Sequence, residues 1–306
     1  MIAGVNRLGI DLGGTKIAAV VLGDDGAERW RRRIATPAGR YEDTLAAIAS
    51  LVNAAKADGH GPFSIGIGTP GTPAANGLMK NCNSECLNGR PLQQDLAARL
   101  GQPVALANDA NCLALSEATD GAGAGADVVF AVILGTGTGA GIAVNGRVLT
   151  GPNGLAGEWG HNPLPWGKDD PQHSCYCGRS GCVETLVSGP ALARDHALVN
   201  GGALGGPGIV AAATAGDTAA QATLERHAER LARALAAVIN LLDPDVIVLG
   251  GGLSLLPHLY ERVPALWGPW VFSGGVRDPV RTRLLPSRHG DASGVRGAAW
   301  LGRGAR

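Results

Sequence analysis

Hydrophobic residues in the first part of the chain form short runs that end at glycine-rich turns, a pattern typical of strands. Residues 41–57 differ, because apolar side chains recur there every three or four positions and share one helix face. This part of the chain is therefore predicted to contain strand 8–12, strand 17–22, strand 29–34, helix 41–57, strand 65–68, helix 91–100, strand 104–107 and a helix from 108 to about 118.

The order strand, glycine turn, strand begins again in the second half. An apolar run at 128–134 precedes a glycine turn at 135–141 and a strand at 142–144. The later elements are predicted to be an amphipathic helix at 219–242, a strand at 246–249, a helix opened by glycines 250–252 and a final helix at 294–301. The repeat indicates an α/β protein with two similar domains around a cleft.

We expect the final helix to cross back onto the first half. The predicted domains are then 1–118, completed by 291–306, and 119–290, which carries the cysteine-rich segment. Both are large enough for a hydrophobic core of their own.

Charge and composition exclude several classes of protein. Lys plus Arg and Asp plus Glu each number 26 among 306 residues, so no global charge indicates nucleic acid or an anionic membrane as partner. The basic run at 29–33 is interpreted as an exposed strand. No apolar run approaches the roughly 20 residues of a membrane span, and no signal peptide is evident. We therefore expect a cytoplasmic protein, where thiols stay reduced.

One imidazole and three thiols lie close together in the segment 157–184: His161, Cys175, Cys177 and Cys182. A Cys₃His set forms a closed tetrahedral zinc site, which leaves no position for a catalytic water. Glycines between Cys177 and Cys182 allow the tight turn that two ligands of one ion require. The alternative is a disulfide with leftover thiols.

Three glycine-rich turns are candidates for holding a nucleotide. Backbone N–H groups in the first two can face phosphate, and Asp11 at the end of a strand suits outer-sphere contact with Mg²⁺. The first two turns can also be simple hairpins, and the third can serve close packing of a helix on a strand or leave room for an adenine ring. The candidate residues are Asp11, Gly13, Gly14, Thr15, Lys16, Gly135, Thr136, Gly137, Gly251 and Gly252.

Asn108 and Asp109 lie between a predicted strand and a predicted helix. Either residue suits an N-cap, and Asp109 equally suits a general base that takes a hydroxyl proton during phosphoryl transfer. Glu158, His161 and Glu184 offer acceptors for several hydroxyls at once, as a polyol ligand requires, although structural roles for them stay open.

Taken together, these residues make the chain similar to sugar kinases of the ROK (repressor, open reading frame, kinase) family. The similar segments are 9–16, 106–111, 157–161 and 175–184. The resemblance implies a duplicated actin-like and hexokinase-like (ribonuclease H-like) fold with ATP and sugar in the cleft. It implies Asp109 as base, structural Zn²⁺ on His161 and the three cysteines, and sugar contacts from Asn83, Asn108, Asp109, Glu158, His161 and Glu184.

Within the family, segments 81–84, 87–91 and 158–166 resemble the bacterial fructokinase (manno-fructokinase) branch most, although Cys86 stands where that branch has an aromatic residue. We therefore expect an ATP- and Mg²⁺-dependent kinase that converts D-fructose to fructose 6-phosphate. Glucose, mannose, N-acetylglucosamine and N-acetylmannosamine are alternative substrates. The oligomeric state stays open, with a homodimer among the options.

Two rival functions follow from the same residues. A sugar-responsive repressor of the family carries a helix-turn-helix before the first glycine turn, where this sequence has seven residues before Leu8. A zinc hydrolase is disfavoured because a Cys₃His shell is closed. Asp109 favours the kinase.

Overall fold

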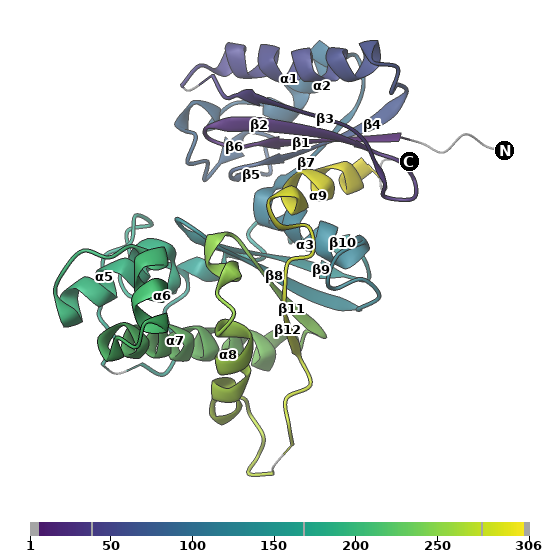
Figure 1. The fold of residues 1–306 in the computed structure, drawn as a ribbon. Coiled ribbons are helices and arrows are strands. Elements are labelled where there is room, and N and C mark those ends of the chain that lie inside the picture. The colour runs from purple at the N-terminus through teal and green to yellow at the C-terminus, as the bar shows by residue number, and fades with distance from the viewer. Residues whose placement is uncertain (1–5, 38, 168, 277, 303–306) are drawn as a thin grey trace.

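The computed structural model describes residues 6–37, 39–167, 169–276 and 278–302. Two α/β halves, each built on a five-stranded sheet, lie one above the other with two helices between them (Figure 1). The two similar halves expected from the sequence are therefore present. Among the described residues, no helix combines the length and apolar character needed to cross a membrane.

The first sheet has the strand order β3-β2-β1-β4-β7. Its strands are β1 (Asn6–Leu12), β2 (Lys16–Leu22), β3 (Glu28–Ala35), β4 (Phe63–Thr69) and β7 (Val104–Asn108). β1, β4 and β7 run parallel, so their carboxyl ends meet at one edge of the sheet. This edge brings together Asp11, Pro70 and Asp109, which lie far apart in the sequence.

Helices cover both faces of this sheet. α1 (Tyr41–Ala57) and α2 (Leu92–Leu100) cover the outer face, and the α1 side chains at the predicted helical spacing are buried there. α9 (Ser293–Leu301) covers the inner face. A side chain at Gly9 or Gly66 would overlap the α9 backbone, which explains why these strand positions are glycine.

The second sheet repeats the plan with the order β10-β9-β8-β11-β12. Its strands are β8 (Val128–Leu134), β9 (Thr138–Val144), β10 (Arg147–Val148), β11 (Val246–Gly250) and β12 (Arg283–Pro286). Its outer side is covered by a helical layer whose core lies along α7 (Figure 1). The helices of this half are α4 (Glu184–Val187), α5 (Gly189–Asn200), α6 (Gly206–Thr214), α7 (Thr218–Leu242) and α8 (Leu259–Trp267).

The remaining elements are short. They are β5 (Thr72–Pro73), β6 (Met79–Lys80), and the 3₁₀ helices η1 (Glu85–Leu87), η2 (Glu158–His161), η3 (Gly252–Leu255), η4 (Gly268–Trp270) and η5 (Gly290–Ala292).

Helices α3 (Asp109–Thr119) and α9 lie between the two sheets and pack directly on each other. A side chain at Gly297 of α9 would overlap the carbonyl group of Cys112 on α3. α3 also reaches both halves, because Leu113 packs in the second half and Leu115 packs beside the first sheet. The final helix thus returns to the first half, as predicted, and α3 joins the halves.

The division into 1–118 with 291–306, and 119–290, stays a prediction, and its residues 1–5 and 303–306 lie outside the described residues. The predicted helix after the third glycine turn is only the 3₁₀ turn η3. The predicted glycine turn at 135–141 is too long, because β9 already begins at Thr138. Gly141 belongs to that strand and is glycine because a side chain there would overlap the backbone of Ala110.

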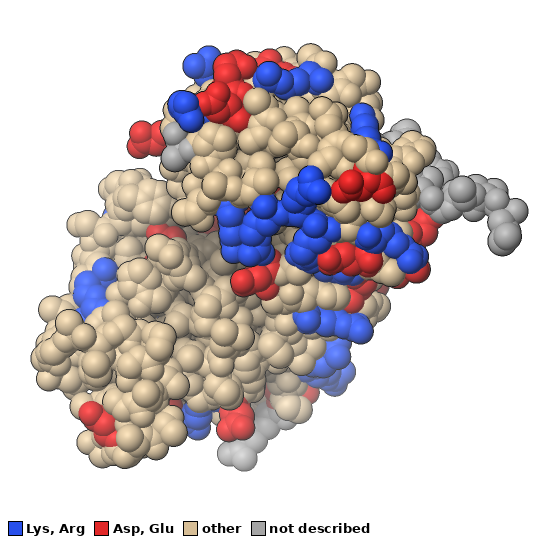
Figure 2. All heavy atoms as spheres, turned by 45° about the horizontal axis from the view of Figure 1, so that its top comes forward, with Lys and Arg blue, Asp and Glu red and all other residues tan. Residues whose placement is uncertain are grey.

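The basic run at 29–33 forms most of the edge strand β3, whose side chains are largely exposed. Arg29 and Arg31 form ion pairs with Asp25 and Glu28 at 2.8 and 2.5 Å. Figure 2 shows basic and acidic side chains next to one another on this side of the molecule, so no large field of a single sign forms there. The interpretation as an exposed strand is confirmed.

Candidate active site

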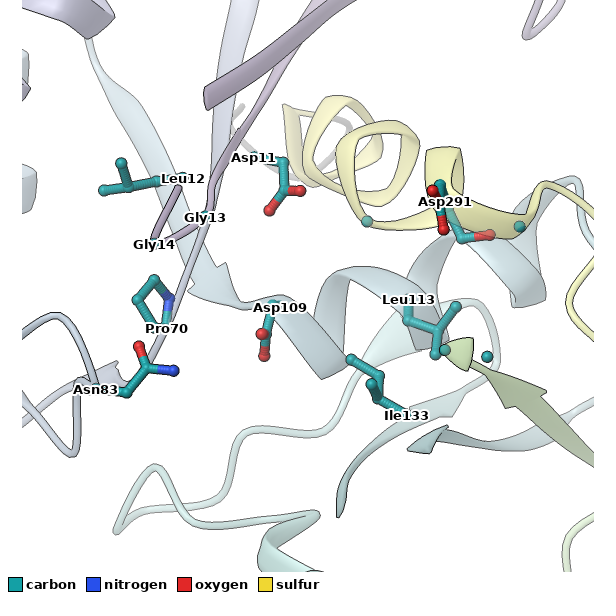
Figure 3. A pocket seen from close by; sticks show the side chains of 15 residues that line it. Asp11, Leu12, Gly13, Gly14, Pro70, Asn83, Asp109, Leu113, Ile133 and Asp291 are labelled. Carbon is teal, nitrogen blue, oxygen red and sulfur yellow. The ribbon is translucent and has the colours of Figure 1, made fainter. Parts of the chain in front are cut away.

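A pocket of about 240 Å³ lies where the carboxyl edges of the two sheets meet. Its walls come from the first glycine turn, the start of α3, the third glycine turn and the segment before α9 (Figure 3). The residues that line it are Asp11, Leu12, Gly13, Gly14, Pro70, Asn83, Asp109, Leu113, Ile133, Gly250, Gly251, Gly290, Asp291, Ser293 and Gly294.

Asp109 is the first residue of α3, and its carboxylate points into this pocket (Figure 3). Asn108 is the N-cap, because its side-chain oxygen accepts a hydrogen bond of 2.9 Å from the Ala110 N–H. The Asp109 carboxylate accepts from the same N–H at 2.8 Å. Capping is thus supplied by Asn108, and the Asp109 carboxylate keeps acceptor capacity toward the pocket.

Burial raises the pKa of Asp109, and the negative charge of Glu158 raises it further. Hydrogen bonds from Ala110 N–H and the Asn108 side chain act in the opposite direction but do not cancel the shift. A carboxylate with a raised pKa is a stronger base than an ordinary aspartate, provided that the pH keeps it ionised.

Asp11 projects from the end of β1 toward the same space as Asp109 (Figure 3). Burial, followed by the charge of Asp109, raises the pKa of Asp11 to about 6, while Lys16 and Arg33 act against this. Two carboxylates that repel each other in a pocket favour a bound cation. Carboxylate oxygens suit Mg²⁺, so the donor chemistry fits the predicted metal.

The three glycine turns differ in what they offer the pocket. Gly13 and Gly14 line it, and the position of a side chain on Gly14 is open space. Gly251 lines it too, but a side chain there would also crowd the backbone of Leu134. Close packing of the third turn on a strand is therefore observed at Gly251, and nucleotide binding by this turn stays a prediction.

Several residues that were predicted to bind the nucleotide do not line this pocket. Thr15 and Lys16 are exposed, and Lys16 begins β2. Gly135 and Gly137 close the second hairpin with a backbone hydrogen bond of 3.0 Å. The predicted residues absent from the lining of this pocket are Thr15, Lys16, Gly135, Thr136, Gly137 and Gly252.

The predicted site residues did not include those that enter the pocket just before α9 and from its first turn. Asp291 and Ser293 line it, and a side chain at Gly294 would lie 3.8 Å from the Asp11 carboxylate. The available signal was the cluster of small and acidic residues ahead of a helix predicted to cross back. Asn83 also lines the pocket, with its amide near Asp109 in Figure 3.

A second cavity of about 430 Å³ adjoins the first, since Leu12, Gly14 and Asn83 line both. Cys86 and Ser84 form part of its wall. Cys82 and Cys112 are buried, so these cysteines are small core and pocket-wall residues as predicted.

His161, Cys175, Cys177 and Cys182 converge, with one ligand atom from each lying within 4.8 Å of the others. His161 Nδ1 is 3.5 Å from Cys175 Sγ, and the sulfurs of Cys177 and Cys182 are 3.6 Å apart. Two thiolates on one tetrahedral zinc at bonds of about 2.3 Å stand roughly 3.8 Å apart. All six cysteines of the chain are free thiols, so the disulfide alternative is wrong. The donor set fits zinc.

Backbone and side-chain contacts already shape the loop that carries these ligands. Cys175 N–H donates to the Arg179 carbonyl at 2.7 Å, and Gly178 N–H donates to the Cys175 carbonyl at 3.0 Å. Asp170 ties the loop to α7 through ion pairs with Arg230 at 3.0 Å and Arg233 at 2.6 Å. Hydrogen bonds with Arg179 lower the pKa of the Cys177 thiol, which favours a thiolate ligand.

Glu184 follows the last cysteine and accepts a hydrogen bond of 2.9 Å from Thr138 N–H in the second hairpin. Glu158 begins η2, and a side chain at Gly160 would overlap the carbonyl of Thr138. The loop that carries the four candidate zinc ligands, the segments of both glutamates and the second hairpin therefore form one packed unit.

The phenol of Tyr176 lies beside this unit. Although most of Tyr176 is exposed, partial burial around its hydroxyl and then the charge of Glu184 raise the pKa of Tyr176 to about 12, with a further contribution from Glu158. Because Glu158 also acts on Asp109, it links the zinc-loop side of the site to the start of α3.

Comparisons with known proteins agree with this architecture. The model of the ROK family matches residues 7–305. An N-acetyl-D-glucosamine kinase of Citrobacter koseri is 40% identical over 304 residues, covering 96% of this chain and 98% of that protein. A ROK hexokinase of Thermus thermophilus has a TM-score of 0.84 at 32% identity, covering 97% of each chain.

A further solved structure is a ROK family glucokinase of Streptomyces griseus in complex with glucose and AMPPNP. It has a TM-score of 0.76 at 32% identity, and the match covers 97% of this chain and 99% of that one. The family model spans nearly the whole sequence, and both structures superimpose on both halves of the fold. The chain therefore belongs to the ROK family and has the α/β, hexokinase-like fold of its sugar kinases.

Proposed function

We propose that this protein is an ATP-dependent hexose kinase with Asp109 as its general base. The observation that carries the proposal is the position of Asp109, a partly buried carboxylate with a raised pKa at the start of α3, facing Asp11 across the interdomain pocket. A kinase needs one carboxylate for the hydroxyl proton and another group near the phosphates. The pocket offers both.

Proton transfer is the step assigned to Asp109. The sugar oxygen forms its bond to the γ-phosphorus while the bond from that phosphorus to the β,γ-bridging oxygen breaks, and ADP leaves. Asp109 accepts the proton that the sugar hydroxyl loses. Asn108 keeps the Asp109 backbone in place by capping α3, so the carboxylate is fixed on a rigid helix end.

Phosphate binding is assigned to Gly13 and Gly14 on one side and to Gly251 on the other, with Asp11 as the group for Mg²⁺. The metal, when bound, neutralises charge on the phosphates. The other predicted residues of the first two turns stay proposed nucleotide contacts: Thr15, Lys16, Gly135, Thr136 and Gly137. Closure of the two halves would bring them nearer the nucleotide and exclude water.

The sugar is proposed to lie between Asp109 and the unit that carries Glu158, His161 and Glu184. His161 and the three cysteines would hold zinc, which fixes the position of the loop. His161 Nδ1 faces the thiols, which leaves Nε2 on the other side of the ring available for hydrogen bonding. Asn83 and Asn108 complete the proposed sugar contacts.

D-Fructose, phosphorylated at its C6 hydroxyl, is our first candidate substrate. The support is the resemblance of segments 81–84, 87–91 and 158–166 to the manno-fructokinase branch. None of the relatives described above is named a fructokinase, so the substrate rests on these segments alone.

N-Acetyl-D-glucosamine is the second candidate. It is favoured by the N-acetyl-D-glucosamine kinase that shares 40% identity over nearly the whole chain. The cavity of about 430 Å³ beside Asn83 and Cys86 would be the room available for an N-acetyl group.

Coupled measurement of ADP release over fructose, glucose, mannose, N-acetylglucosamine and N-acetylmannosamine tests both levels of the proposal. The fructose proposal requires the highest kcat/KM for fructose. A higher value for N-acetylglucosamine would replace fructose and leave the kinase intact. If folded, zinc-loaded protein releases no ADP with any sugar of the panel, the sugar-responsive regulator would be favoured.

A further inference from the structure

A buried group of two arginines and two aspartates attaches the cysteine loop (residues 162–183) to the helical layer of the second half. Arg230 on α7 contacts Asp170 of this loop at 3.0 Å and Asp195 on α5 at 2.8 Å. Arg233, also on α7, contacts Asp170 at 2.6 Å. Only 5 to 11% of each of these four side chains is exposed. Charges so deeply buried require their partners, so Asp170 is fixed on α7.

The backbone just before Asp170 is shaped to bring this carboxylate onto α7. Trp166 has a φ of 57°, a left-handed conformation that is rare for a bulky side chain and persists only where surrounding contacts impose it. Its ring stacks on Trp270 of η4, with centroids 5.6 Å apart. A side chain at Gly167 would overlap the Asp170 carboxylate. Stacking, strain and a glycine therefore all serve the same attachment.

Asp170 lies between the two parts of the chain that supply the candidate zinc ligands. His161 comes before it, in η2, which packs against the second hairpin. Cys175 comes after it, in a hairpin of residues 173–182 (the cysteine hairpin) that includes a hydrogen bond of 2.7 Å from Cys175 N–H to the Arg179 carbonyl. The attachment of Asp170 to α7 thus limits how far the cysteine hairpin can move from His161.

We propose that Asp170 is a positioning residue for the zinc site, whose ion pairs with α7 hold the cysteine hairpin where its thiolates and His161 reach one ion. Ligands that are already held close together bind a metal more tightly, because less conformational entropy is lost on binding. This inference rests on the zinc part of the proposed function, since it takes the four ligands to hold zinc.

Asp170→Asn tests the inference, and Asp195→Asn is the matched control. Each variant removes one carboxylate from Arg230, and the two carboxylates are almost equally buried. In excess zinc both should lower the Tm by about 4–8 °C, because each breaks a buried ion pair. Only Asp170→Asn should raise the Kd for zinc, by about tenfold, since only Asp170 belongs to the cysteine loop. The Kd is measured by titrating zinc-loaded protein with a chromophoric chelator, without sugar or ATP.

Trp166→Ala is a second variant, chosen because half of this side chain is exposed and its loss should not prevent folding. It removes the stacking on Trp270 that helps to attach the same segment. The zinc Kd should therefore rise in Trp166→Ala as well, by a smaller factor than in Asp170→Asn.

The outcomes separate a positioning role from a merely structural one. A zinc Kd for Asp170→Asn within about twofold of wild type would overturn the inference. An equal rise in Asp195→Asn would overturn it too, because loss of any buried charge would then explain the effect. If Asp170→Asn does not fold, an unchanged Kd in Trp166→Ala decides against the inference. A wild-type protein that binds no zinc removes this inference together with the zinc site, whereas the kinase is judged separately by ADP release.

Discussion

Glu117 provides the sharpest structural prediction, because it is fully buried on α3 and joins that helix to the segment before α9. One carboxylate oxygen accepts from Ala122 N–H at 2.7 Å and from Arg288 N–H at 3.2 Å. The other accepts from the hydroxyls of Ser287 at 3.0 Å and Ser293 at 2.8 Å. The segment so held contributes Asp291 and Ser293 to the pocket.

Glu117→Gln keeps the shape of the side chain and removes its charge. A hydrogen bond to a charged group contributes about 1 kcal/mol more than a neutral one, so four bonds lose about 4 kcal/mol together. The lower desolvation cost of a neutral amide offsets part of this. We expect a net loss of about 2–4 kcal/mol, which lowers the Tm by about 3–6 °C at this chain length.

Thermal unfolding of Glu117→Gln and the wild-type protein measures this loss of stability. Kinase activity measured over a range of ATP concentrations shows the effect on nucleotide binding. Because the segment at 287–293 lines the pocket, the KM for ATP should rise more than the KM for sugar. Glu225→Gln is the control, since Glu225 pairs with Arg262 at a site where both side chains are nearly half exposed. If Glu117→Gln unfolds within about 1 °C of wild type, the assigned role of this carboxylate is refuted.

Four further outcomes follow from the site and the contact between the halves. Removing zinc with a chelator, or Cys182→Ser, should lower the Tm and raise the sugar KM together, because a structural metal couples binding to folding; unchanged values of both would make the metal incidental. The kcat/KM should fall as the pH drops through about 6, because Asp11 loses its charge there, and protonation of Asp109, whose pKa is also raised above its ordinary value, should add to the fall. Glu158→Gln should move this acid limb to lower pH, since the Glu158 charge raises the Asp109 pKa; a limb that stays in place contradicts the assignment. Gly297→Ala should cost about 3 kcal/mol or more, because its methyl group would overlap the Cys112 carbonyl between α3 and α9, and a wild-type Tm would show that this packing yields freely.

Much of the fold can be predicted from the sequence in segments where the pattern of apolar and polar side chains matches their burial. The helix predicted at 41–57 has these bounds in the structure, because its apolar face is regular and faces a single sheet. β8 and β11 are equally clear, since strands buried on both faces are apolar throughout. The start of β9 was missed because glycines at 139 and 141 carry no side-chain pattern and are there for contact with α3.

In the candidate site, too, residues within a local sequence pattern could be predicted and residues brought in by long-range contacts could not. The convergence of His161 and the three cysteines could be predicted because all four lie within one short segment and belong to chemically distinctive residue types. The common location of Asp109 and Asp11 in one pocket could be predicted because each lies at the end of a strand beside a recognisable turn. The positions of Asp291, Ser293 and Glu117 could not be predicted, since their contacts form only when α9 returns to α3, across 170 to 176 residues of sequence.

The central claim is that Asp109 takes the proton of the sugar hydroxyl, and Asp109→Asn tests it most directly. The variant should bind sugar and zinc and unfold at or above the wild-type Tm, because the raised pKa of Asp109 means that its charge destabilises the folded protein at neutral pH. Its kcat for the best sugar should fall about 100- to 10,000-fold. A folded Asp109→Asn protein whose kcat stays within about tenfold of wild type would contradict the account.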